Sequence, residues 1–538
     1  MLTDVEKEKI LNELTLDEKI GQMFCMYYAA HKPYEEMMKE WENIKVGSVF
    51  VAGVTPEEIK KLTESLATFG KLPPMIAADV EKGPGHAVLG EGDLPHEMAW
   101  GSCNDDELIE KAHIATAERC RELGIHWSFS PLVDINFNMN NPAVNVRTIS
   151  DVPECVARIG AAAVRGYQKN GMMVAGCKHF PGDGVDGRNQ HFCTTVNSLS
   201  KEDWMNSFGM VYKEMFKAGT ASVMVAHISL PSYDEKIDDI LGYPPASLSY
   251  NLQTKLLKGE LGFEGCIVSD ALSMVGACAV VDHDRLAIEF VKAGGDVLLF
   301  PLPEWHGYIK AAVENGEIPM ERIDDAVRRI ITMKDKARLF ENQEDVLKDI
   351  THEYDIAEMA ARISEKSICK IRDARNLIPL KLSKGDKILI INLKYGKNPL
   401  PFYDCELDVV EEELKKRGFE TVSFVNPSRA DIESHMGDSA AVLINNHIGQ
   451  VSAGGSKRIN WEHIAPFWRG EVLKHKNMIF TSFGDPYKLY DYPFLSTYIN
   501  THSTMVSSQR AFVKALLGEI PFEGKNPVSL EGFFEAEV

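Results

Sequence analysis

The chain lacks several features that mark other classes of protein. Its ten cysteines form no Cys-x-x-Cys pair, so neither a zinc knuckle nor a disulfide framework is indicated, and reduced thiols are expected. No stretch approaches the roughly 20 apolar residues that a membrane-spanning helix needs. The first residues, MLTDVEKEKILNELTLDEKIGQMF, lack a basic segment followed by an apolar run, so no signal peptide is predicted. We therefore expect a cytoplasmic protein with no membrane partner.

Basic residues are also scarce. The sequence holds 58 Lys and Arg against 79 Asp and Glu, which gives a formal net charge of −21. Such a surface repels polyanions, so no nucleic-acid partner is expected, and a neutral substrate such as a sugar fits better. At 538 residues the chain exceeds what one hydrophobic core usually serves, so we expect at least two domains.

Short apolar runs alternate with helical stretches through the first two-thirds of the chain. Their apolar continuity and β-branched enrichment are typical of parallel strands covered on both faces. The predicted strands lie at 46–53, 74–80, 127–134, 172–180, 221–228, 265–272 and 296–301. Helices are predicted between them, at 56–66, 105–123, 152–170, 201–218 and 282–293. Repeated β-α units build a closed barrel or an open sheet, and a length of about 340 residues favours the (β/α)₈ barrel.

A second, smaller α/β unit follows the barrel. Its apolar runs at 387–393, 440–446 and 477–487 again indicate buried strands with helices between them. We predict a catalytic barrel at 1–345, a helical linker at 346–366 and a C-terminal αβα sandwich domain at 367–538.

Polar residues stand where the predicted barrel strands end. In a barrel the reactive groups gather at the carboxyl ends of the strands. Burial of an unpaired charge costs several kcal/mol, so we do not expect these residues to serve as packing in the hydrophobic core. The set comprises Asp79, Glu81, Asp134, Lys178, His179, His227 and Asp270. Three histidines, His179, His191 and His227, could gather around zinc, but no HExxH-like spacing is present and no metal is expected.

Asp270 has the features of a glycosidase nucleophile. Such a carboxylate must stay ionised and attack the anomeric carbon of a sugar. In IVSDAL, Ser269 precedes Asp270 and Ala271 leaves room beside it. An aspartate before ALSM could equally cap a helix, and the pattern alone does not choose between the two roles.

Long motifs in this sequence resemble glycoside hydrolase family 3, and more narrowly its β-N-acetylglucosaminidase branch. The motifs are PLVDINFNMNNPAVNVRT (131–148), KHFPGDG (178–184), SVMVAHISLP (222–231), GFEGCIVSDALSMVGA (262–277) and KSICKIRDARNLIPLK (366–381). The resemblance spans nearly the whole chain and implies that Asp270 is the nucleophile. It also implies a set of sugar-binding residues, namely Asp79, Asp134, Arg147, Lys178, His179 and His227.

The acid/base loop departs from the family pattern. The resemblance implies that His191 is the acid/base, and histidine suits the role because it titrates near neutral pH. Asn189 stands where the family has an aspartate that orients this histidine. Asp183 replaces a second histidine, and either Asp183 or Asp186 could fold back to serve as the partner. In DVEKGPGH, Lys82 replaces a usual glycine, which leaves the exact sugar open.

The leading hypothesis is a retaining exo-β-glycosidase that acts on terminal β-linked N-acetylglucosamine through a covalent glycosyl-aspartate, with a small carbohydrate as its partner and no cofactor. One alternative is a β-glucosidase whose acid comes from the second domain, where Glu411, Glu412 and Glu433 are available. Another is a glycoside phosphorylase, because a neutral histidine tolerates phosphate better than a carboxylate does. A sugar-binding protein that has lost catalysis is the alternative of another class. Homo-oligomerisation is left open.

Overall fold

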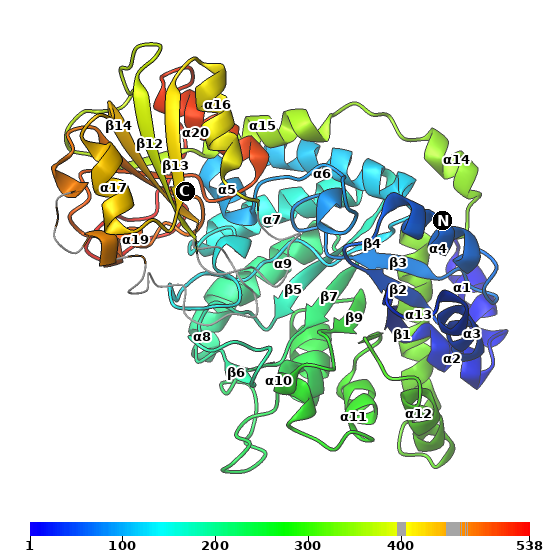
Figure 1. The fold of residues 1–538 in the computed structure, drawn as a ribbon. Coiled ribbons are helices and arrows are strands. Elements are labelled where there is room, and N and C mark those ends of the chain that lie inside the picture. Colours follow the sequence, from blue (N-terminus) through cyan, green and yellow to red (C-terminus); the bar gives the residue numbers. More distant parts are fainter. Residues whose placement is uncertain (395–404, 448–462, 464, 468–469, 471) are drawn as a thin grey trace. The chain divides into compact units, whose positions relative to one another are not determined.

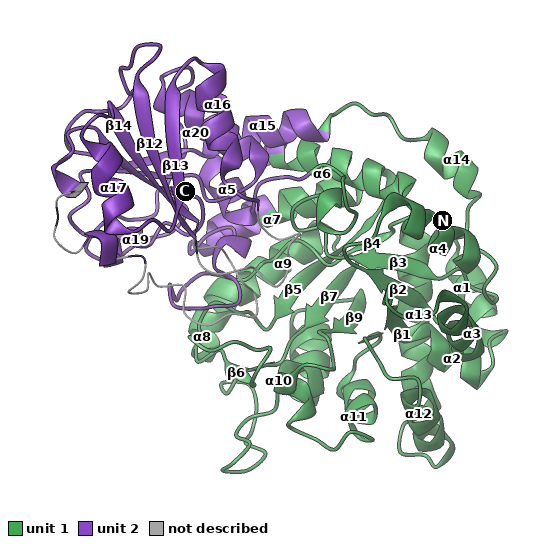
Figure 2. Cartoon of the chain, in the orientation of Figure 1, with its two compact units in different colours: residues 1–92, 109–135, 160–355 green, residues 93–108, 136–159, 356–538 purple. Residues whose placement is uncertain are grey.

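The computed structural model describes residues 1–394, 405–447, 463, 465–467, 470 and 472–538 (Figure 1). The chain divides into two compact units (Figure 2). The first comprises residues 1–92, 109–135 and 160–355, and the second comprises residues 93–108, 136–159 and 356–538. Each unit has its own sheet and its own apolar core.

The first unit contains a parallel eight-stranded sheet in the order β10-β1-β2-β3-β4-β5-β7-β9. A parallel bridge between Val268 and Val297 joins the β9 side to the β10 side, so the sheet closes on itself. The predicted (β/α)₈ barrel is therefore confirmed. Its strands are β1 (Phe24–Tyr27), β2 (Ser48–Val51), β3 (Met75–Ala78), β4 (Trp127–Ser128), β5 (Val174–Phe180), β7 (Ser222–Val225), β9 (Cys266–Ser269) and β10 (Leu298–Leu299).

Helices alternate with these strands along the chain. Helix α4 occupies the predicted residues Pro56–Leu66 because Thr55 and Glu58 form a capping box and Pro56 opens the first turn. The other helices of the first unit include α1 (Asp4–Asn12), α2 (Leu16–Gln22), α3 (Tyr34–Ile44), α8 (Lys201–Trp204), η4 (Met205–Gly209), α9 (Met210–Lys217), η6 (Asn251–Glu260), α10 (Val275–Cys278), α11 (Leu286–Ala293), α12 (Trp305–Glu314), α13 (Met320–Lys336) and α14 (Gln343–Lys348). Helices α6 (Asp106–Glu122) and α7 (Pro153–Tyr167) contribute residues to both units.

A buried ionic cluster holds strand β9 in the barrel. The Asp296 side chain is fully buried, and its Oδ2 accepts a hydrogen bond of 2.8 Å from the backbone N–H of Ile267. Its Oδ1 pairs with Arg322 and lies 3.4 Å from the Nζ of Lys258. Because β9 ends directly before Asp270, this cluster also fixes the height of that carboxylate in the barrel.

We expect Asp296→Ala to lower the free energy of unfolding by about 3–5 kcal/mol, because it leaves Arg322 buried without its inner partner. Urea unfolding followed by circular dichroism measures this change. Asp345→Ala is the matched control, since Asp345 is 68% exposed and pairs only with a surface lysine, Lys348. The control should change stability by less than about 0.5 kcal/mol. Equal effects of the two variants would contradict a structural role for the cluster.

The second unit contains a six-stranded sheet in the order β11-β16-β15-β14-β12-β13. All neighbours are parallel except β11, which runs antiparallel to β16. The strands are β11 (Cys369–Asp373), β12 (Lys387–Lys394), β13 (Glu420–Val425), β14 (Ala441–His447), β15 (Met478–Ser482) and β16 (Thr497–Asn500). Its helices include α5 (Glu97–Cys103), α15 (Ile356–Ser367), α16 (Asp408–Lys416), α17 (Arg429–Met436), α19 (Lys488–Asp491) and α20 (Val506–Leu516).

Alternate residues of this sheet enter two separate apolar clusters. Leu389 and Ile391 of β12 belong to one cluster, whereas Ile388 and Ile390 belong to the other. Both faces of the sheet are therefore covered, which confirms the predicted αβα sandwich. The predicted boundaries after residues 345 and 366 stay a prediction.

The cysteines and the lengths of the helices bear on two expectations drawn from the sequence. All ten cysteines are free thiols, and seven of them are buried. Among the described residues, none of the helices has the length and apolar content needed to cross a membrane.

Candidate active site

Asp270 lies directly after β9, at the carboxyl ends of the barrel strands. Its backbone N–H donates to the carbonyl of Val225 on neighbouring β7 at 2.8 Å, and its Oδ1 accepts from the N–H of Ala271 at 2.7 Å. Burial by itself would raise the pKa of this carboxyl, but His179, His227 and His191 together hold the pKa below its ordinary value. The carboxylate is therefore kept ionised, as a nucleophile requires.

Lys178 lies near the end of β5 between two carboxylates. Its Nζ is 2.6 Å from Asp79 Oδ1 and 2.8 Å from Glu81 Oε1. Lys178 and Glu81 are each 3% exposed, whereas the Asp79 side chain is 35% exposed. The sequence places Glu81 at this strand end without assigning it a role, and in the structure it is the buried partner that fixes the ammonium group. Asp79 keeps an open face that can accept hydrogen bonds from hydroxyl groups.

Asp134 is fully buried and holds His179. Its Oδ2 lies 2.7 Å from the Nδ1 of His179, and its Oδ1 accepts from the backbone N–H groups of His179 at 3.1 Å and Asp183 at 2.7 Å. With Nδ1 turned to Asp134, the Nε2 of His179 is the nitrogen that can meet a ligand. The geometry thus gives Asp134 a positioning role, and its direct contact with substrate stays a prediction.

His191 has Asn189 as its neighbour on the loop after β5. Asn189 Oδ1 accepts from the backbone N–H of His191 at 3.0 Å and lies 2.6 Å from His191 Nδ1. A backbone N–H can only donate, so the amide atom at this point is the oxygen, and the facing Nδ1 must carry the proton. His191 Nε2 is then the nitrogen that gives or takes a proton. The predicted partner position is thus filled by an amide that orients the imidazole without charging it.

The loop that carries His191 is attached to the segment that follows Asp270. The N–H of Val275 donates to the carbonyl of His191 at 3.2 Å, and Thr194 Oγ1 donates to the carbonyl of Gly276 at 2.9 Å. A Cβ on Gly276 would lie only 2.5 Å from the carbonyl oxygen of Gln190, so the two segments are in direct backbone contact. The acid/base candidate and the nucleophile candidate are therefore held on contiguous backbone.

Asp186 anchors the same loop from its other side. Its carboxylate pairs with Arg188 at 2.6 Å and accepts from the backbone N–H of Val196 at 2.9 Å. Burial opposes the charge, but the bonds from Arg188 and Val196 lower the pKa of Asp186. Val196 belongs to a short strand, β6 (Thr195–Val196), that pairs with β8 (Ile228–Ser229). A role for Asp186 or Asp183 as the partner of His191 stays a prediction.

His227 uses both ring nitrogens within the protein. Its Nε2 donates to the carbonyl of Ala271 at 3.0 Å, and its Nδ1 lies 2.9 Å from Ser247 Oγ and accepts from it. Burial lowers the pKa of the imidazole below its ordinary value. Its backbone N–H donates to Gln190 Oε1 at 3.2 Å. These contacts favour a positioning role beside Asp270, and the predicted sugar contact of His227 stays a prediction.

Gln190 and Ser247 were missed as site residues. The sequence holds a signal for each, since Gln190 directly precedes His191 and Ser247 lies in the run PASLS (245–249). Arg147 belongs to the second unit, where it ends the short helix η2 (Asn145–Arg147) and donates to the carbonyl of Ala143 at 3.0 Å. Its role in sugar binding stays a prediction.

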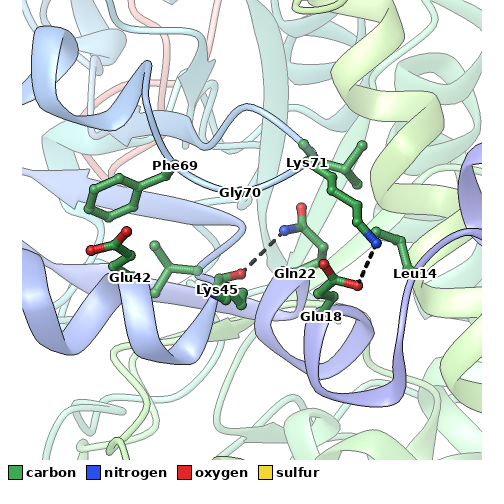
Figure 3. A pocket seen from close by; sticks show the side chains of 10 residues that line it. Leu14, Glu18, Gln22, Glu42, Lys45, Phe69, Gly70 and Lys71 are labelled. Carbon is green, nitrogen blue, oxygen red and sulfur yellow. Dashed lines mark hydrogen bonds and ion pairs between the residues drawn. The ribbon is translucent and has the colours of Figure 1, made fainter.

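A separate pocket lies at the opposite ends of the strands (Figure 3). Gln22 precedes β1 and donates to the carbonyl of Lys45 at 3.3 Å, whereas Lys71 pairs with Glu18 at 3.1 Å. The amino ends of barrel strands serve stability rather than catalysis, so we do not assign this pocket to the reaction. Within the described part of the chain, no cluster of three or more His, Cys, Asp or Glu side chains is arranged to hold a metal ion.

Comparison with known proteins gives a consistent set of relatives. The family model of the glycosyl hydrolase family 3 N-terminal domain matches residues 15–333. A β-N-acetylglucosaminidase/β-glucosidase of Cellulomonas fimi is 31% identical over 96% of this chain and 94% of its own length. A solved β-glucoside phosphorylase, BglX bound to 2FGlc, is 28% identical with a TM-score of 0.87 and coverage of 98% of this chain and 97% of its own. The family 3 β-N-acetylglucosaminidase of Paenibacillus sp. str. FPU-7 is 26% identical with a TM-score of 0.84, over 98% of this chain and 100% of its own.

Proposed function

Because this chain belongs to glycosyl hydrolase family 3, we propose that it is a retaining exo-β-glycosidase that removes terminal β-linked N-acetylglucosamine. The observation that carries the proposal is Asp270 at a barrel strand end, on a segment that is hydrogen-bonded to the loop of His191. The Cellulomonas fimi relative, a β-N-acetylglucosaminidase/β-glucosidase, supports this choice of sugar.

The reaction proceeds in two displacements. First, a carboxylate oxygen of Asp270 attacks the anomeric carbon while His191 Nε2–H protonates the leaving oxygen, so the glycosidic bond breaks and a glycosyl-aspartate forms. Second, the now neutral His191 takes a proton from water, which attacks the same carbon and releases Asp270. The two inversions retain the configuration. Asn189 keeps the Nδ1 proton in place, so the reactive nitrogen is always Nε2.

The remaining polar residues bind the sugar. Lys178 and the Nε2 of His179 donate to its hydroxyls, and Asp79 accepts from them through its open face. Arg147 completes this set in the proposal. Three further residues hold this set in position. Asp134 fixes His179, and Glu81 fixes Lys178. His227 fixes the backbone beside Asp270.

Phosphorolysis is the second candidate, favoured by Asn189. A carboxylate at this position would repel a phosphate dianion near the anomeric carbon, whereas the amide does not. Phosphate would then replace water in the second step, break the Asp270–carbon bond and release the sugar 1-phosphate. The similarity to a β-glucoside phosphorylase supports this candidate as well.

Aryl donors with and without inorganic phosphate separate these reactions. We expect release of free N-acetylglucosamine from its p-nitrophenyl β-glycoside in phosphate-free buffer, and slower turnover of the β-glucoside. If added inorganic phosphate instead accelerates turnover and yields a sugar 1-phosphate, the second candidate is correct. A 2-fluoro donor tests the non-enzymatic alternative. Binding without covalent labelling of Asp270 would contradict both catalytic candidates.

The proposal also includes the surroundings of the enzyme. Ten free thiols support a cytoplasmic location, since disulfides are rare there. The net charge of −21 argues against nucleic acid as a partner. A barrel at 1–345, a linker at 346–366 and a sandwich domain at 367–538 remain the proposed division.

A further inference from the structure

Aromatic side chains occupy the rim of the barrel next to the nucleophile. We propose that Tyr27 and Phe300 form a wall that stacks against the leaving group and so helps to select it. This inference rests on the proposed function, because it takes Asp270 as the point where the sugar is attached.

The wall is continuous with the backbone that carries Asp270. Leu272 donates from its N–H to the carbonyl of Leu299 at 3.2 Å, and the N–H of Phe300 donates to the carbonyl of Cys25 at 3.0 Å. Tyr27 is the last residue of β1, and Phe300 directly follows β10. In the strand order of the sheet, β10 and β1 are neighbours, and β9 approaches β10. The rim next to Asp270 is thus aromatic on this side.

Buried rings support the exposed one. The Tyr27 ring lies 5.1 Å from that of Phe300 in an edge-on arrangement and 6.2 Å from that of Phe50 in a stacked one. The Phe50 ring in turn stacks on that of Phe129 at 5.7 Å. Tyr27 is 43% exposed, whereas Phe50 is 5% and Phe129 is 1% exposed. Tyr27 is therefore an open aromatic surface whose orientation is set by the rings beneath it.

Phe300 adopts a backbone conformation that disfavours its own side chain. Its φ of 56° lies in the left-handed region, which a bulky residue rarely adopts. Backbone strain of this kind gathers at ligand sites, where the surrounding structure maintains it. Here the aromatic contacts with Tyr27 and Phe50 hold the ring at the mouth of the barrel.

The positions of the polar residues and of the exposed Tyr27 ring indicate which part of the substrate meets this wall. The proposed hydroxyl ligands of the sugar on Asp270 come from other strands, since Asp79 follows β3 and both Lys178 and His179 lie on β5. Tyr27 offers an exposed ring at the rim, where the group bonded to that sugar must pass. A second sugar presents a C–H face, and an aryl group presents a π-face, and both stack on aromatic rings. The occupant is therefore a ring of the leaving group.

Two donors that share one sugar test this inference. The β-N-acetylglucosaminyl fluoride has no leaving-group ring, whereas the chitobiose-type disaccharide carries a second sugar. For Tyr27→Ala we expect kcat/KM to fall about 5- to 30-fold with the disaccharide and to stay within about twofold with the fluoride. Tyr27→Phe keeps the stacking face and should behave as the native enzyme. Phe300→Gly, which also removes the backbone strain, should reproduce the selective loss.

The control is Tyr250→Ala, because Tyr250 is 53% exposed but directly precedes helix η6 in the outer layer of the barrel. It should leave both donors unaffected. Equal losses with both donors would place Tyr27 against the sugar on Asp270 and would overturn the inference. Unchanged kcat/KM values with both donors would also overturn it. If the native enzyme turns over neither donor, the proposed function itself is wrong.

Discussion

Replacement of Asp270 by alanine is expected to abolish turnover, with kcat on an aryl β-N-acetylglucosaminide falling about 10⁴-fold or more. The variant cannot form the glycosyl-aspartate, so the direct attack of water is all that remains. Steady-state release of the aryl group measures the loss. Added azide can enter the space left by the carboxylate, and it should restore part of the rate and give the α-glycosyl azide, with inverted configuration.

Asp284→Ala is the matched control for this variant. Asp284 is an exposed aspartate on the segment that follows the nucleophile, and its removal should leave kcat unchanged. A native-like rate for Asp270→Ala would refute the assignment of the nucleophile. Since the histidines hold the pKa of Asp270 below its ordinary value, the carboxylate keeps its charge as the pH falls. A loss of activity that begins above about pH 4 on acidification must therefore reflect the titration of another group.

Replacement of His191 by alanine is expected to depend on the leaving group. With an unactivated donor, such as a disaccharide, kcat/KM should fall about 10²- to 10⁴-fold, because the departing oxygen receives no proton. A glycosyl fluoride needs no such proton, so its kcat/KM should change little. The pH profile of kcat/KM for the disaccharide should also lose its basic limb, since loss of the imidazolium proton produces that limb in the native enzyme.

Azide and a second histidine complete this test. Azide should accelerate release of the sugar from the glycosyl-aspartate of His191→Ala and yield the β-glycosyl azide, of retained configuration, opposite to the product from the Asp270 variant. His283→Ala is the control, because the His283 side chain is 56% exposed and pairs only loosely with Glu304, at 3.6 Å. Equal losses for fluoride and disaccharide in His191→Ala would exclude His191 as the acid.

Much of the fold could be predicted because buried parallel strands leave a strong pattern. The seven predicted apolar runs each contain a strand of the barrel, and both sheets are confirmed. The missing strand, β1 (Phe24–Tyr27), reads FCMY. It follows helix α2 within two residues and has no β-branched residue, so local pattern alone did not separate it from the helix.

For the candidate site, the sequence predicted positions along the strands but not the contacts between side chains. The rule that reactive groups follow barrel strands correctly located Asp270, Lys178 and His179 at strand ends. It could not tell which of the polar groups face inward, because that depends on contacts between distant segments. Asp134 bonds to backbone N–H groups more than 40 residues away, and His227 bonds to Ser247 and Ala271. A list of strand ends contains no information about such bonds.

The join between the His191 loop and the Val275–Gly276 segment has a consequence for how this enzyme could change. The distance between proton donor and attacking oxygen decides whether a retaining mechanism operates, and here the hydrogen bonds between two main-chain segments set it. Substitutions there would move both reacting groups at once, whereas the rim at Tyr27 can vary without altering their separation. New substrate preferences should therefore arise at the mouth of the barrel, while residues 275–276 stay as they are.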